Sequence, residues 1–405
     1  MPTPSLPSAR MTSLDGLRGI AALIVLAHHA SLLNPAISGA YVPVPGSSGP
    51  AAGSLAWWFT YTPLKLFTAG PEAVVVFFVL SGFVLSLPVL SPRTFDWMAY
   101  YPRRIVRIGL PVVCSLVFAA ALALLVPQVV AHAMSGWVAT TSVPDLSVET
   151  FIGQLDPTRT YHLLNNPLWS IYWEVAFSVM LPLFLGLAVW LRRVWPLILL
   201  VAAVTVFLGV DSGADGLRYL PPFFLGVVAA VLLPRIRRLG ATVSGWRLGW
   251  AVWLLGLIGS ALLLIAHWMV GPGVAPLALT ALQPVAALGL LICCLEWRPL
   301  ASLLSHQPFR WAGKISFSLY LVHVPIIVTL SYALRDWGPT KVAALAIPVA
   351  LIVGTLFYQL VEKRSHTLSK LFGSTVARAF ERRSGEAAAT AEPMEPAELP
   401  SRAAR

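Results

Sequence analysis

The first apolar segment of the chain, residues 14–33, contains two polar residues whose types and spacing could do chemistry. Arg18 and His29 are eleven residues apart. At about 100° per residue, this spacing puts both side chains on one face of a helix, about 16 Å apart along its axis. A charge inside a membrane helix costs about 2.5–3.5 kcal/mol and therefore usually marks a functional site. The pair suits a channel lining, or a tunnel that joins a charged cofactor to a buried reaction centre.

The composition indicates that a membrane-embedded helical bundle must position these side chains. The 405 residues are 57% hydrophobic and 11% charged, with a mean hydropathy of +0.77. Because these values lie outside the range of soluble globular proteins, we expect an all-α polytopic membrane protein. The Arg and Lys residues that give the net charge of +11 lie mainly in the connections between apolar segments, and this placement argues against nucleic acid as a partner. The three cysteines lie in apolar segments and predict buried thiols, without a disulfide framework.

About ten transmembrane helices are expected, of which the fifth and sixth are short. One set of alternate connections carries twelve Arg and Lys residues, whereas the other carries five. Because Arg and Lys are enriched on the cytoplasmic side, both termini are predicted to be cytoplasmic. The expected spans are 14–33, 72–90, 105–126, 168–190, 195–210, 219–233, 246–270, 275–296, 314–334 and 340–361.

The rest of the chain is divided by composition. Residues 1–11 are predicted to be a disordered N-terminus, residues 12–373 one transmembrane domain, and residues 374–405 a disordered cytoplasmic tail. The two longest connections, 34–71 and 127–167, lie outside in this topology. They suit lids over an outward-facing cavity, or interfacial loops anchored by Trp.

An ordered set of short motifs accompanies the Arg–His pair. The set resembles acyltransferase family 3, which consists of integral-membrane O-acyltransferases, and it spans nearly the whole membrane region. Where that family often has an acidic residue two positions before a Phe pair, this chain has Val75, with Glu72 three residues earlier. The motifs are LDGLRGIAA at 14–22, FFVLSGF at 77–83, RIVR at 104–107, WSIYWE at 169–174 and ISFSLYLVH at 315–323.

The resemblance implies an enzyme that moves an acyl group, expected to be acetyl, from cytoplasmic acyl-CoA to a hydroxyl. The implied acceptor is of carbohydrate type: a surface or lipid-linked glycan, or a glycosylated metabolite such as a macrolide. Acyl-CoA would be a co-substrate, so neither a permanently bound cofactor nor a metal is expected. The implied location is the bacterial cytoplasmic membrane, as a multi-pass protein.

Acyl transfer to a hydroxyl needs a base, and His29 is the natural candidate because the ordinary pKa of imidazole is about 6.5. In the predicted topology, Glu174 lies at a comparable depth and is predicted to orient His29, as a carboxylate does in a hydrolase dyad. The alternative is a buried pair that only holds two helices together. The adjacent His28 points about 100° away and is predicted to contact another helix or line the pore.

Arg18, Arg104 and Arg107 lie near the predicted cytoplasmic ends of their spans, and guanidinium groups suit phosphate. We predict that they dock the phosphates of the donor. The alternative for Arg104 and Arg107 is ordinary positively charged flanking of a span. Contacts to substrate or oxyanion are predicted for four further residues, each of which has an alternative structural role: Ser81, Trp169, Tyr320 and His323.

Two other classes of function remain open at this point. The Arg18–His29 stripe would also suit a proton- or anion-coupled membrane transporter. A structural or sensory membrane subunit is the third possibility, and such a protein should tolerate the loss of His29.

Overall fold

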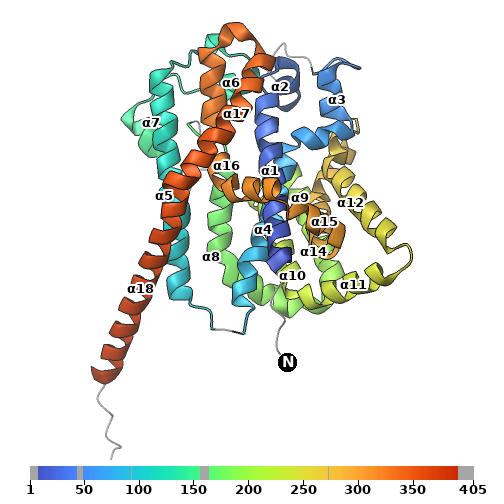
Figure 1. Ribbon diagram of the computed structural model, residues 1–405, viewed down its shortest axis with the longest axis vertical. Coiled ribbons are helices and arrows are strands. Elements are labelled where there is room, and N and C mark those ends of the chain that lie inside the picture. The colour runs from blue at the N-terminus through green and yellow to red at the C-terminus, as the bar shows by residue number, and fades with distance from the viewer. Residues whose placement is uncertain (1–7, 43–48, 93, 156–163, 272, 391–405) are drawn as a thin grey trace, which may run out of the picture.

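The computed structural model describes residues 8–42, 49–92, 94–155, 164–271 and 273–390, which form helices and no strand (Figure 1). The α-helices are α1 Ser8–Ser31, α2 Pro35–Tyr41, α3 Leu55–Tyr61, α4 Gly70–Val89, α5 Trp97–Leu125, α6 Gly136–Thr141, α7 Val148–Gly153, α8 Leu168–Leu191, α9 Trp195–Ser212, α10 Asp215–Val231, α11 Leu233–Gly245, α12 Gly249–Ile265, α13 Val274–Ala281, α14 Gln283–Glu296, α15 Arg298–Leu304, α16 Gln307–Ala333, α17 Pro339–Phe357 and α18 Lys363–Thr390.

Within the described ranges, seven helices are long and apolar enough to cross a membrane, or nine if each of two bent pairs is one span. One of the seven, residues 168–212, contains both α8 and α9, joined by a short turn at Arg192–Val194. The all-α membrane class is therefore confirmed, whereas the count of ten spans stays a prediction. The start of α1 and the end of α18 lie at the same end of the molecule (Figure 1). That this end is cytoplasmic also stays a prediction.

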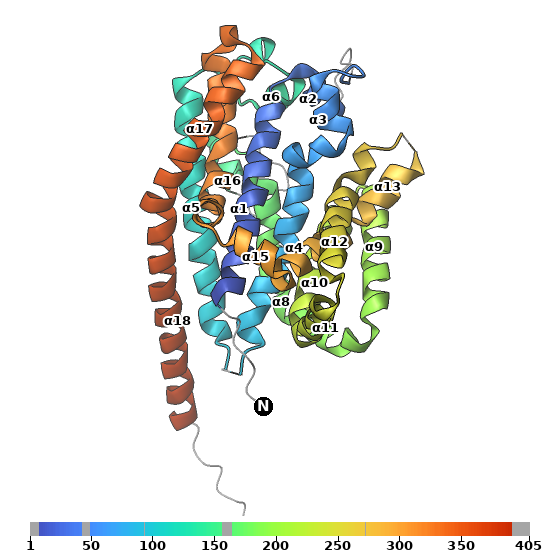
Figure 2. The same cartoon turned by 45° about the vertical axis from the view of Figure 1, so that its right-hand side comes forward.

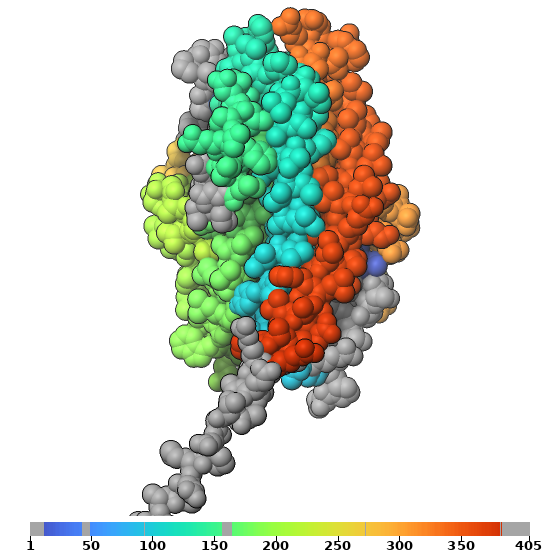
Figure 3. All heavy atoms as spheres, turned by 90° about the vertical axis from the view of Figure 1, so that its left-hand side faces the viewer, coloured from blue at the N-terminus to red at the C-terminus, as the bar shows by residue number. Residues whose placement is uncertain are grey.

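The terminal segments differ from the expected disorder. Helix α1 begins at Ser8, inside the predicted N-terminal arm, and α18 continues to Thr390, well beyond residue 374. Figure 3 shows α18 packed beside α5 along one face of the molecule. Gly373 permits this contact, because a Cβ there would lie 2.3 Å from the Arg103 side chain. This contact with α5 supports α18 around Gly373. Residues 1–7 and 391–405 lie outside the described part of the chain.

Helices α1 and α16 lie side by side at the centre of the bundle and run in the same direction. They touch through glycines: a Cβ on Gly19 would lie 2.6 Å from the backbone nitrogen of Gly313. Small residues let membrane helices approach this closely. His29 and His323 each follow their glycine by ten residues. Equal offsets on two parallel helices bring the two imidazoles to the same level.

Short helices cover the end of the bundle where α1 finishes (Figure 2). Helix α2 bends back from α1 by 111°, and α3 lies beside it. Helix α6 packs on α2, where the backbone N–H of Trp137 donates to Ser38 Oγ at 2.8 Å. The described parts of the two long connections therefore form a layer of short helices over this end, and their role as lids stays a prediction.

Candidate active site

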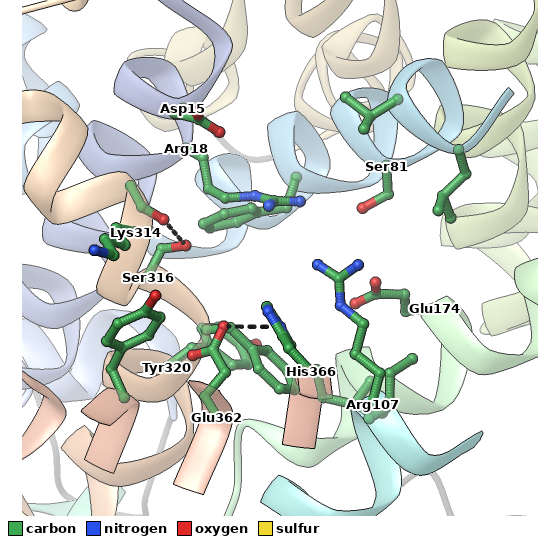
Figure 4. A pocket seen from close by; sticks show the side chains of 18 of the residues that line it. Asp15, Arg18, Ser81, Arg107, Glu174, Lys314, Ser316, Tyr320, Glu362 and His366 are labelled. Carbon is green, nitrogen blue, oxygen red and sulfur yellow. Dashed lines mark hydrogen bonds and ion pairs between the residues drawn. The ribbon is translucent and has the colours of Figure 1, made fainter. Parts of the chain in front are cut away.

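A cavity of about 520 Å³ opens among α1, α4, α5, α8 and α16. Along α16 its lining changes from the exposed side chains of Arg310 and Lys314 to the buried side chains of Ser316 and Tyr320. The exposed residues therefore mark the mouth, and Tyr320 belongs to the inner wall. Figure 4 shows side chains from several helices pointing into this common space.

The cavity brings together the three arginines that the sequence analysis assigned to phosphate. Arg18 comes from α1, whereas Arg104 and Arg107 come from α5. Arg104 is fixed by Glu174: its Nη2 lies 3.0 Å from Glu174 Oε1, and its Nε donates to Ser178 Oγ at 3.1 Å. A guanidinium held in this way presents its remaining N–H groups in one orientation, which suits an anionic ligand.

Glu362 is a cavity residue that the sequence analysis did not assign to the site. It ends a π-helical turn, Tyr358–Glu362, that interrupts the passage from α17 to α18. Such turns often lie at functional sites. Its Oε2 accepts a hydrogen bond from Ser318 Oγ at 2.5 Å, and its Oε1 lies 3.6 Å from His366 Nε2. The sequence signal was a Glu directly after the last expected span, beside the basic pair at 363–364.

His29 lies against His323 and not against Glu174, which corrects the predicted dyad. The distance between His323 Nε2 and His29 Nδ1 is 3.0 Å. Glu174 binds Arg104, so it is Arg104 that this carboxylate orients. The estimate of equal depth was insufficient because depth along the bundle does not determine which helix faces which.

The hydrogen-bond partners assign the tautomers of both neutral imidazoles. His323 Nδ1 lies 2.9 Å from the carbonyl oxygen of Tyr320 and 3.0 Å from that of Leu319. Carbonyl oxygens only accept, so His323 Nδ1 carries the hydrogen and His323 Nε2 is an acceptor. His29 Nδ1–H therefore donates to His323 Nε2, sharing its hydrogen with the carbonyl of Val25 at 3.0 Å. This leaves the lone pair of His29 on Nε2, the arrangement that a general base requires.

The four predicted substrate contacts fall in different places. Ser81 and Tyr320 line the cavity, and the Tyr320 hydroxyl bonds with Ser170 Oγ at 2.7 Å. His323 lies one helical turn beyond Tyr320, with a ring-centroid distance of 5.7 Å. Trp169 is not among the cavity residues; it packs on Tyr219 and Phe78 in the aromatic core. Its position therefore fits the structural alternative.

A second polar cluster adjoins His28 at the covered end of the bundle. His28 Nδ1 donates to the carbonyl of Thr68 at 3.0 Å, and its ring lies 4.8 Å from that of Tyr41. This helix-contact role is one of the two that the sequence analysis predicted. The Lys65 ammonium donates to the Tyr41 hydroxyl and lies 4.5 Å from the ring of Trp268. Burial lowers the pKa of Lys65 to about 8.

Glu72 completes this second cluster. Its Oε1 accepts from Trp268 Nε1 at 2.8 Å and lies 3.3 Å from His267 Nε2. Glu72 therefore ties the start of α4 to the Ala266–Trp268 turn. Sequence spacing gave no signal for this contact, because its partners lie almost 200 residues apart.

An arginine-lined cavity beside a paired imidazole, inside a bundle of apolar helices, is the arrangement expected of a membrane-embedded enzyme. Comparison with known proteins supports this class, because an acyltransferase-domain family model matches residues 11–359. The chain belongs to this family, acyltransferase family 3, and it is a multi-pass integral membrane O-acyltransferase.

Two curated relatives are acyltransferases. Acyltransferase MdmB of Streptomyces mycarofaciens is 29% identical over 392 residues, which cover 87% of this chain and 91% of that protein. "Putative peptidoglycan O-acetyltransferase YrhL" of Bacillus subtilis (strain 168) is 25% identical over 354 residues, which cover 80% of this chain and 55% of YrhL. No solved structure matches the chain significantly.

Proposed function

We propose that the protein transfers an acetyl group from cytoplasmic acetyl-CoA to a hydroxyl of a carbohydrate-type acceptor. The observation that carries this proposal is the position of the arginine-lined cavity, whose inner wall at Tyr320 lies one helical turn from the His29–His323 pair. One end of the site suits phosphates, and the other suits proton transfer.

The donor occupies the cavity in this proposal. Arg18, Arg104 and Arg107 bind its phosphates, because guanidinium groups form strong charge-assisted hydrogen bonds with phosphate oxygens. Lys314 and Arg310 at the mouth add positive charge along the route of entry. The pantetheine arm extends along α16 towards Tyr320, which brings the thioester within reach of His29. Donor entry at this end agrees with the predicted cytoplasmic location of the termini.

His29 acts as the general base. Its Nε2 removes the proton from the acceptor hydroxyl, whose oxygen then attacks the thioester carbonyl carbon. A new C–O bond forms, the C–S bond breaks, and the same proton passes to the departing sulfur, so CoA leaves as a thiol. His323 orients the base by accepting the hydrogen of His29 Nδ1, and stabilises the imidazolium that forms.

The acceptor reaches His29 from the end covered by α2, α3 and α6. Trp137 of α6 has its ring 5.4 Å from that of His29. An aromatic face beside the base suits the apolar face of a sugar ring. A surface or lipid-linked glycan fits this reading, and the printed name of YrhL refers to peptidoglycan. A glycosylated metabolite such as a macrolide offers the same chemistry. The bacterial cytoplasmic membrane, where acetyl-CoA and such acceptors meet, is the proposed location.

The test measures the consumption of labelled acetyl-CoA by the purified protein, in the presence of glycan and macrolide acceptors, with products identified by mass spectrometry. His29→Ala should reduce transfer by about 10²–10⁴-fold, the usual contribution of a general base, while acetyl-CoA still binds. His132→Ala is the matched control, because His132 is exposed, is not a cavity residue and precedes α6.

The outcomes separate the parts of the proposal. Transfer by folded His29→Ala at the wild-type rate would refute the assignment of the base. Binding of acetyl-CoA without transfer to any acceptor would refute the acceptor class. Failure of the wild-type protein to bind acetyl-CoA would refute the assignment of acetyl-CoA as the donor.

A further inference from the structure

A second cavity, of about 450 Å³, shares no residue with the first. It lies between α11, the start of α12 and the junction of α14 with α15. Helix α11 lies at the end of the molecule where α1 begins (Figure 1). The proposed acyl transfer does not use this cavity.

The geometry of this cavity is fixed by close contacts. Helix α11 bends from α10 by 73° and so lies across the bundle. A Cβ on Gly240 would lie 2.8 Å from Glu296 Oε2, so a glycine is needed for α11 to pack on that side chain. At the far end of α11, Trp253 Nε1 donates to Ser244 Oγ at 3.1 Å. The walls of the cavity are therefore held in place on two sides.

Arginines outnumber carboxylates in and near this cavity. Arg237 and Arg298 line it together with one carboxylate, Glu296, which is only 5% exposed. Glu296 is the sole Asp or Glu in residues 216–335 of the sequence. Three more arginines lie on the same segment of the chain: Arg235, Arg238 and Arg247. A site with this excess of guanidinium groups favours a phosphate anion.

Three tryptophans also line the cavity, and one of them faces the surroundings of the bundle. Trp250 and Trp253 come from α12, and Trp297 comes from the α14–α15 junction. Trp250 is 61% exposed, and Leu248 and Leu255 beside it are also exposed. Trp is enriched where membrane proteins meet the headgroup region, and exposed Leu on a membrane helix faces lipid chains. The cavity thus joins a phosphate-binding interior to a lipid-facing surface.

We propose that this cavity binds the headgroup of an anionic phospholipid, with the phosphate held by Arg237 and Arg298 and the acyl chains lying along α12. Basic pockets between membrane helices suit this class of ligand. A soluble phosphate ester would use the same guanidinium groups but would gain nothing from the exposed face of α12. The test therefore compares a phospholipid with a soluble phosphate ester as the source of the phosphate.

The experiment is native mass spectrometry of the full-length protein in detergent, titrated with phosphatidylglycerol, phosphatidylcholine or glycerol phosphate. Phosphatidylglycerol should bind at least tenfold more tightly than phosphatidylcholine. Arg298→Gln should weaken phosphatidylglycerol binding about tenfold, the cost of one charge-assisted hydrogen bond. Arg298 is exposed, so its replacement leaves packing intact, and exposed Arg193 provides the matched control variant Arg193→Gln.

Equal binding of the two lipids would overturn the proposal, as would an unchanged affinity in Arg298→Gln. Glycerol phosphate binding that Arg298→Gln abolishes, without preference for the anionic lipid, would reassign the cavity to a soluble phosphate. Trp250→Ala supplies a second measurement, because it should weaken lipid binding and leave glycerol phosphate binding unchanged. Equal loss for both probes in Trp250→Ala would contradict the position of the acyl chains.

Discussion

Replacement of Gly19 by Ala should impair turnover although Gly19 does not line the active-site cavity. The added Cβ would lie 2.6 Å from both the Gly313 nitrogen and the Phe309 carbonyl oxygen. Ordinary van der Waals contact begins at 3.4 Å, so α1 and α16 must separate by about 0.8 Å. Both opposing atoms belong to backbone, so no side chain can move aside.

The separation acts on the histidine pair about 15 Å further along both helices. If the helices move apart in parallel, the distance of 3.0 Å between His29 Nδ1 and His323 Nε2 becomes about 3.8 Å. That value exceeds the range of a hydrogen bond. Because displacement of a catalytic group by about 1 Å can cost about 10²-fold in rate, kcat should fall by about 10–100-fold. Overpacking should also cost about 1–3 kcal/mol of stability.

The assay compares kcat, the Kd for acetyl-CoA and the thermal midpoint of wild type and Gly19→Ala. The matched control is Gly259→Ala, because a Cβ at Gly259, also within a helix, would meet nothing within 4 Å. The control should keep wild-type turnover and be slightly stabilised, since Ala favours helix over Gly by about 1 kcal/mol. Wild-type kcat in a folded Gly19→Ala protein would refute the argument that the glycine contact sets the histidine pair.

Three further predictions concern single side chains. Arg18→Ala should raise the KM for acetyl-CoA about tenfold with little change in kcat, measured from initial rates; an unchanged KM would contradict phosphate docking. His323→Ala should lower kcat and alter the pH profile of kcat. His323→Gln should retain part of the rate, because the Gln amide oxygen can accept the hydrogen of His29 Nδ1. Equal loss of kcat in both variants would contradict the orienting role of His323. Burial lowers the pKa of Lys65 from its ordinary value of 10.5 to about 8, so the folded state binds fewer protons than the unfolded state between these pH values. The stability of wild type relative to Lys65→Met should therefore rise by about 1.4 kcal/mol per pH unit from pH 8 to 10.5, measured by thermal melts; a difference that does not change with pH would refute this.

The sequence predicted the parts of the fold that depend on local pattern. Each of the ten expected ranges contains a helix, because apolar runs of this length specify membrane helices whatever their partners. Three of the four arginines that line the cavity, Arg18, Arg104 and Arg107, were predicted as site residues, because each lies beside or within an apolar span.

The features that depend on packing between distant helices were not predictable. The pairing of His29 with His323, in place of Glu174, follows from the Gly19–Gly313 contact, and no periodicity within one helix specifies that contact. The helix from residue 374 to Thr390 was missed because its polar composition suits solvent and does not by itself distinguish a helix from a disordered tail. The position of Glu362 in the cavity depends on a π-helical turn, which the apolar pattern does not predict.

The cluster around Lys65 and Glu72 has a consequence for the order in which the protein is assembled. Glu72 precedes its partner Trp268 by 196 residues. At a synthesis rate of about 5–20 residues per second, roughly 10–40 s pass between the two. During that interval the nascent chain holds a lysine and a carboxylate whose partners on the α12 segment have not been made. The contacts of Lys65 and Glu72 with Trp268 can therefore form only after α12 has been made. A completed cluster is thus a sign that most of the bundle is already in place.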